Sequence, residues 1–258
     1  MTNLKDVTGN YFPNPDLVIG SDQLRGAKHV NKFGHITSVA CADVLEDVWD
    51  LGGVYTYPTT GRIHNIVSAS SDDTACGIGA RTLEIEGLDI NYNEIKETVT
   101  LDGTCSVATN NEYFRVHRMR VVTVGSNLYN VGQITATAQT DGTISAGILA
   151  GASGGNQTHM AIYTVPAGKV GYITQIYHSI GKKQSVKSTI DLVVRDSTLA
   201  NAAFNTKFTM DGNTTGTTYA CHHPSPYLVI PSKSDIKVDA TTSSAGANLT
   251  AGFDIILM

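Results

Sequence analysis

Apolar and polar residues alternate over short runs along most of the chain. From 80 to 88, apolar residues alternate with acidic ones, and from 95 to 101 they alternate with threonines. A period of two is typical of a strand that buries one face. Turn signatures such as Asp102-Gly103 separate these runs at short intervals. The pattern therefore predicts an all-β chain of antiparallel strands.

One stretch of this pattern, Val54 to Asp89, returns later in the same order. VYTYPTTGRIHNI is answered by IYTVPAGKVGYI from Ile162, TLEIEGLD by TIDLVVRD, and VTLDG by FTMDG. Ordered matches of this kind indicate duplication of a unit of about 100 residues, the size of one small domain. Chance similarity between two strand-rich segments is the alternative.

We predict two tandem antiparallel β-sandwich units, jelly-roll-like, over residues 48–150 and 151–258. Residues 1–47 are predicted to form an extended N-terminal arm, because they contain several turn residues and no sustained period. Such an arm either lies along a partner or stays mobile, and the sequence leaves both open. Trp49, the only tryptophan, is expected to cover the first core.

The composition excludes several classes of protein. Charged residues make up 16% of the chain and the net charge is -5, which argues against a nucleic-acid partner. No apolar run is long enough to suggest a membrane span or a secretion signal, so we expect the chain to be made and kept in the cytosol. Free cysteines follow from that compartment. Cys221, His222 and His223 are consecutive, so they would point to alternate faces and are not expected to share a metal ion.

No catalytic constellation emerges, and we predict no enzyme activity, no cofactor and no metal. The segment from Asp89 opens like a calcium loop, but Glu94 stands where glycine is needed and Thr100 where glutamate is needed. It is interpreted as a polar turn. Glu84 and Glu86 share one strand face and could imitate a glycosidase pair, but they are interpreted as the solvated face of a strand.

Candidate partner-binding residues lie in two places. The arm carries apolar and aromatic residues without a core of their own, and the strand over 113–124 carries a basic face that also includes His117. The candidates are Tyr11, Phe12, Leu17, Val18, Ile19, Arg115, Arg118 and Arg120. The basic face is expected to meet an acidic partner surface; a solvated outer face is the alternative.

Three blocks carry a resemblance to a known family: EDVWD-x-GG-x-YT-x-P from Glu46, GART-x-x-x-EGLD from Gly79, and AIYTVPAGK from Ala161. They resemble structural proteins of tailed bacteriophages, familiar chiefly from phages of marine and aquatic bacteria. The similar region runs from about Phe33 to the C-terminus. The resemblance implies a virion component: a head decoration or cement protein, or part of the neck or tail.

The resemblance also implies partners and a location in the virion, with assembly in the host bacterial cytoplasm. The expected partners are the major capsid protein or other virion subunits, with a homo-oligomer on the particle. A carbohydrate- or receptor-binding module is the alternative function, since sandwiches carry such sites on their end loops. Aromatic residues are only 7% of the chain and the one tryptophan, Trp49, precedes the repeated stretch that starts at Val54, which favours the structural role.

Overall fold

The structure is a computed structural model that describes residues 19–20, 24–39 and 42–258. It confirms the all-β prediction, with antiparallel pairing throughout. Among the described residues no helix could cross a bilayer. The elements are β1 Lys28–Ile36, β2 Glu46–Asp47, β3 His64–Ser68, β4 Ala80–Leu88, β5 Glu94–Thr100, β6 Val107–Ala108, β7 Arg115–Val124, β8 Ile134–Ala138, β9 Ile144–Ile148, the 3₁₀ turn η1 Gly151–Gly154, β10 Ile162–Thr164, β11 Gly171–Asp196, β12 Asn205–His222, β13 Leu228–Ile230, β14 Ser234–Thr242 and β15 Asn248–Leu257.

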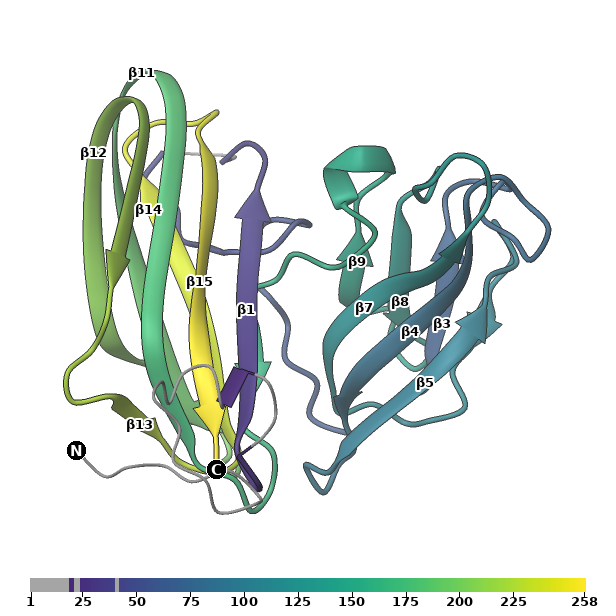
Figure 1. Ribbon diagram of the computed structural model, residues 1–258, viewed down its shortest axis with the longest axis horizontal. Helices are drawn as coiled ribbons and strands as arrows, with labels where there is room; N and C mark the ends of the chain where they lie inside the picture. The colour runs from purple at the N-terminus through teal and green to yellow at the C-terminus, as the bar shows by residue number, and fades with distance from the viewer. Residues whose placement is uncertain (1–18, 21–23, 40–41) are drawn as a thin grey trace.

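The strands form two lobes that lie side by side (Figure 1). In the N-terminal lobe a four-stranded sheet, β6-β3-β8-β9, faces a three-stranded sheet, β5-β4-β7. Alternation explains the packing: Leu83 and Ile85 of β4 are fully buried, while Glu84 and Glu86, which alternate with them, are only partly buried. The apolar faces of both sheets enclose one core.

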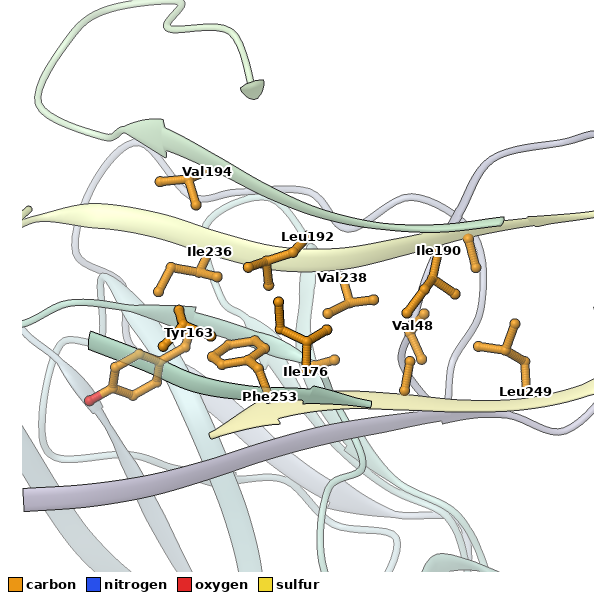
Figure 2. Packing of buried hydrophobic residues seen from close by; sticks show 14 of the residues in the cluster. Val48, Tyr163, Ile176, Ile190, Leu192, Val194, Ile236, Val238, Leu249 and Phe253 are labelled. Carbon is orange, nitrogen blue, oxygen red and sulfur yellow. The ribbon is translucent and has the colours of Figure 1, made fainter. Parts of the chain in front are cut away.

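The C-terminal lobe is built around a long two-stranded ribbon, β11 and β12, which folds over on itself (Figure 1). The first half of β11 pairs with β15 and the second half with β14. The ribbon's register shifts between Lys182 and Val186, where it passes from one layer to the other. Ile176 and Phe253 of one layer therefore pack against Leu192 and Val238 of the other (Figure 2).

An extended arm was predicted over residues 1–47, but this prediction is wrong for residues 28–36 and 46–47, which are strands of the C-terminal lobe. Strand β1 pairs with β15 along its whole length, from Lys28 opposite Leu257 to Ile36 opposite Leu249. Strand β2 pairs with β14. Residues 28–36 show only a weak alternation, and they form a strand because β15 offers them an unpaired edge. The C-terminal lobe thus takes strands from both ends of the described chain.

Strand order in the two lobes corresponds. In the N-terminal lobe β4 lies between β5 and β7. In the C-terminal lobe the second half of β11 lies in the same way between β12 and β14. Likewise β6-β3-β8 matches β13-β11-β15. The duplication itself stays a prediction. Residues 54–57, which open the first copy and were expected to form a strand, lie outside the strands.

Trp49 is buried in the core of the N-terminal lobe, as the sequence predicted. Its ring meets Tyr55 edge-on at 5.3 Å, and its indole N–H donates to the Gly52 carbonyl at 2.8 Å. The indole is therefore both packed and hydrogen-bonded.

We predict that Trp49→Ala lowers the free energy of unfolding by about 3–5 kcal/mol, because it leaves a large cavity in this core. Urea titration followed by tyrosine fluorescence and far-UV circular dichroism would measure the loss. A change below about 1 kcal/mol would contradict the packing described.

Candidate functional site

The densest set of buried polar groups lies where the lobes meet, a zone we call the junction. The chain crosses it twice, over residues 48–63 and 149–161. The two crossing segments are hydrogen-bonded to each other, from Asp50 N to His159 O at 3.0 Å and from Ala161 N to Val48 O at 2.9 Å. Val48 N also donates to Val238 O of β14 at 2.9 Å. Both crossings are thereby fixed to the C-terminal lobe.

Asp235 is the centre of the junction. Its side chain is fully buried, and it accepts hydrogen bonds from Arg115 Nε and Nη2, both at 3.0 Å. Arg195 Nε donates at 2.9 Å and the Thr164 hydroxyl at 2.6 Å. Arg115 belongs to β7 of the N-terminal lobe and Asp235 to β14 of the other, so the ion pair joins the two lobes. A fork-to-fork pair of this kind fixes orientation as well as distance.

Tyrosines of the first crossing segment complete this cluster. The Tyr57 ring lies 5.1 Å from the Arg115 guanidinium carbon and 4.3 Å from that of Arg195. It also contacts Tyr55 edge-on at 4.8 Å. Burial raises the pKa of Tyr55 to about 12, and burial raises that of Tyr57 well above its usual value. Both phenols stay neutral, and the Tyr57 face stabilises the two cations.

A second ionic group lies beside the first on β14. Lys237 Nζ donates to Asp47 of β2, and the other carboxylate oxygen of Asp47 accepts from Tyr55 N at 2.7 Å. Asp239 Oδ2 lies 3.5 Å from Lys237 Nζ. Burial raises the pKa of Asp239 to about 6, and the neighbouring Lys237 only partly offsets it.

A bulge in β7 aims side chains into the junction. Pairing between β4 and β7 shifts between Glu86 and Gly87, leaving His117 as the extra residue. A Cβ at Gly87 would lie 2.0 Å from the Arg115 carbonyl oxygen, so only glycine fits beside this bulge. His117 Nε2 accepts from Thr164 N at 3.2 Å.

Two basic groups near the bulge have pKa values below their usual ones. Burial lowers the pKa of His117, and the charges of Lys32 and Arg115 lower it further. Burial also lowers the pKa of Lys32, with Arg118 adding to the effect. Lys32 Nζ donates to the His117 carbonyl, so a side chain of β1 contacts the N-terminal lobe directly.

A cleft of about 450 Å³ opens beside this contact. Residues 28–32 of β1 line one side, and residues of β4, β5 and β7 line the other, among them Glu86 and Arg118. Lys28 reaches across to Glu94 at 2.7 Å. The cleft is lined by charges of both signs and carries no catalytic set among the described residues.

The predicted partner-binding residues are distributed differently from expectation. Tyr11, Phe12, Leu17 and Val18 lie outside the described residues, and Ile19 is buried. Arg115 lies on the same sheet face as Arg118 and Arg120, but it is buried against the C-terminal lobe and paired with Asp235, so it is not on a solvated outer face. Arg118 is half-buried and donates to Asn31 O at 2.7 Å. Arg120 alone is exposed, paired with Glu84 at 2.6 Å.

Sequence reasoning gave no role to Asp235, Arg195, Asp47 or Thr164. These residues stand in stretches that recur or that carry the resemblance, and they were noted only as members of those stretches. Nothing in their spacing shows that residues 47, 115, 164 and 235 meet, because the contacts form between strands far apart in the chain. The presence of polar residues in otherwise apolar blocks was the one available signal.

Two other groups bear on metal chemistry. His35, Asp50 and His159 each offer a ligand atom, and these atoms lie within 4.8 Å of one another. Sequence reasoning missed this group. Cys221 Sγ lies 3.5 Å from His223 Nε2, while His222 stacks on Phe208, so the three consecutive residues point to different sides.

Comparison with known proteins adds little. No family model matches the sequence, and no curated protein matches it. A solved subviral particle of VP2 from infectious bursal disease virus aligns at 11% identity over 91% of this chain and 73% of that one, with a TM-score of 0.22. A structure of the Gx strain of that virus aligns at 10% identity over 92% and 77%, with a TM-score of 0.16. At these TM-scores the likeness carries no argument.

We predict that Asp235→Asn lowers the free energy of unfolding by about 3–5 kcal/mol, because it leaves Arg115 and Arg195 buried without a counter-charge. Denaturant titration measures the change. Glu84→Gln is the matched control, since it makes the same exchange in the exposed pair with Arg120 and should cost less than about 1 kcal/mol. Equal effects of the two substitutions would contradict the central place of Asp235.

We predict that Asp239 makes stability fall as pH rises from about 4 to 6. Its folded pKa of about 6 exceeds the ordinary 3.8, so the folded state binds more protons than the unfolded state in that window. The fall should reach about 3 kcal/mol at most. Urea titrations of the wild type and Asp239→Asn across the window measure it: the difference between them should grow with pH. A constant difference would contradict the raised pKa.

Proposed function

We propose that this chain is a non-enzymatic structural protein of a tailed-bacteriophage virion, acting as a decoration or cement protein on the head surface. One observation carries the proposal. Residues from each of the three blocks that resemble phage structural proteins lie at the junction: Asp47 and Tyr55 from the first, Gly87 from the second, and Thr164 from the third. Each of the three blocks therefore supplies residues to the junction that joins the two lobes.

The chemistry of the junction supports a structural role. An active site keeps charged groups available to a substrate, but the carboxylate of Asp235 is surrounded by three donors of its own chain and has no exposure. We expect such a network to hold the two lobes in one relative orientation. A preorganised surface binds a partner at a lower entropic cost than a mobile one.

The exposed surface offers contacts suited to subunit binding. Strand β12, strand β13 and the segment between them carry Tyr219, Tyr227 and Val229, each at least half exposed. Aromatic side chains are enriched where proteins bind one another, and exposed apolar patches mark such sites. The proposed partners are the major capsid protein or other virion subunits, and further copies of this chain on the particle.

Quantitative mass spectrometry of purified particles tests the proposal. We expect this chain at a fixed ratio to the major capsid protein, in hundreds of copies for a head decoration protein. A copy number of a single small ring would assign it to the neck or tail instead. Its absence from washed particles would overturn the virion role.

A carbohydrate- or receptor-binding module is the second candidate, favoured by a separate hollow of about 390 Å³. Tyr227 is half exposed there beside His29, Gln175 and Asp254. An exposed ring next to polar side chains is the arrangement that sugars bind. Glycan-array binding that is lost in Tyr227→Ala and retained in Tyr129→Ala, an exposed tyrosine elsewhere, would favour this function over the first.

A further inference from the structure

A cluster of two imidazoles and one carboxylate lies where β1 meets both crossing segments. His35 comes from β1, Asp50 from the first crossing segment and His159 from the second. The Asp50 carboxylate lies 3.1 Å from His159 Nδ1 and 3.7 Å from His35 Nδ1. Three segments distant in sequence thus direct metal-binding atoms at one point.

Burial makes this cluster unlike an ordinary surface ion pair. The Asp50 side chain is 1% exposed, and His159 is 14% exposed. Within the described chain, both carboxylate oxygens of Asp50 and Nδ1 of His159 are buried without a hydrogen-bond partner. The 3.1 Å contact between them therefore lacks hydrogen-bond geometry. Burying a carboxylate without a hydrogen-bond donor costs free energy, and a bound cation would offset that cost.

The local backbone is built to bring these groups together. A Cβ at Gly34 would lie 1.8 Å from the Val48 carbonyl oxygen and 2.7 Å from Ala161 N, so only glycine lets β1 lie this close to both crossing segments. The hydrogen bond from Asp50 N to His159 O, at 3.0 Å, holds two of the three residues side by side. The Phe33 ring packs on the His159 imidazole at 5.2 Å between centroids.

We propose that His35, Asp50 and His159 bind one divalent transition-metal ion, with zinc as the expected species. Nitrogen and carboxylate ligands hold zinc at about 2.0–2.2 Å, which separates ligand atoms of a tetrahedron by about 3.4 Å. His159 Nδ1 lies 3.1 Å from Asp50 Oδ2, close to that edge, and His35 Nδ1 lies 3.7 Å from the other oxygen, Oδ1. The three ligand atoms lie within 4.8 Å of one another, so His35 has to move inward to complete a tetrahedral set. His35 has a side chain 30% exposed, so its ring has room to turn and complete the set.

The ligand types at this cluster favour a transition-metal ion. Two imidazoles and one carboxylate suit zinc and related first-row ions better than calcium or magnesium, which prefer oxygen ligands.

The ion acts as a cross-link rather than a catalyst. It joins the edge strand β1 to both segments that connect the lobes, at a place the Arg115–Asp235 pair does not reach. A ligand that binds only the folded state raises its stability by mass action. This inference concerns the body of the protein and is independent of the proposed virion role.

Isothermal titration of zinc into chelator-treated full-length protein tests the proposal. We expect one saturable site per chain and a rise in Tm of about 5–10 °C at a hundredfold excess of free zinc over Kd. His35→Gln should weaken binding more than about tenfold and remove most of the Tm rise. This variant should fold, because His35 is the most exposed ligand; Asp50→Asn is the second variant.

Two controls separate this site from others. His29→Gln changes a histidine on the same strand that pairs with Asp254, and Cys221→Ser removes the thiol beside His223. Both should bind zinc as the wild type does. Cobalt in place of zinc should show ligand-field absorption without a thiolate charge-transfer band. Absence of saturable binding in the wild type, equal binding in His35→Gln, or loss of binding in Cys221→Ser would each overturn the assignment.

Discussion

The arrangement of this protein depends on one buried carboxylate. Asp235 receives two hydrogen bonds from Arg115 across the junction and one each from Arg195 and Thr164 within its own lobe. Removing charges from water costs several kcal/mol per ion, and only complete pairing offsets that cost. The pair therefore forms only when both lobes are folded and docked, which ties their relative position to the fold of each one.

Apolar burial builds each lobe, but polar contacts orient them. Each sandwich has its own apolar core. Between them lie the ionic groups around Asp235 and Lys237, the contact of Lys32 with β7, and the aromatic pair Tyr55–Tyr57. Apolar contact alone is non-directional, whereas bidentate ion pairs permit one geometry. Apolar cores that fold each lobe, together with ion pairs that fix their orientation, would suit a protein that presents fixed surfaces to a partner.

The same constraint explains which side chains are available for binding. Arg115 is paired with Asp235, and Arg118 donates to a carbonyl of β1. These two arginines of β7 therefore bind other parts of the same chain and are not free to bind a partner. The proposed virion contacts therefore fall on the outer strands β12 and β13. The proposed metal site lies at the inner edge, where β1 closes the C-terminal lobe. Structural cohesion and partner binding would thus use different parts of the surface.

Most of the strand structure could be predicted, because alternation is local. The burial of Leu83 and Ile85, the turn at Asp102-Gly103 and the cover provided by Trp49 all follow from residues within one strand or turn of each other. The extended arm was predicted in place of β1, because the alternation in residues 28–36 is weak and its pairing with β15 spans more than 200 residues.

The sequence by itself determined the all-β class, the inward face of most strands and the absence of any familiar catalytic motif. Only the tertiary structure decided that Arg115 faces inward, that Asp235 lies between two arginines, and that His35, Asp50 and His159 converge. The physical reason is the distance in sequence over which the contacts act. Side-chain alternation is written into neighbouring residues, but register, bulges and lobe docking depend on contacts between strands that no local pattern encodes.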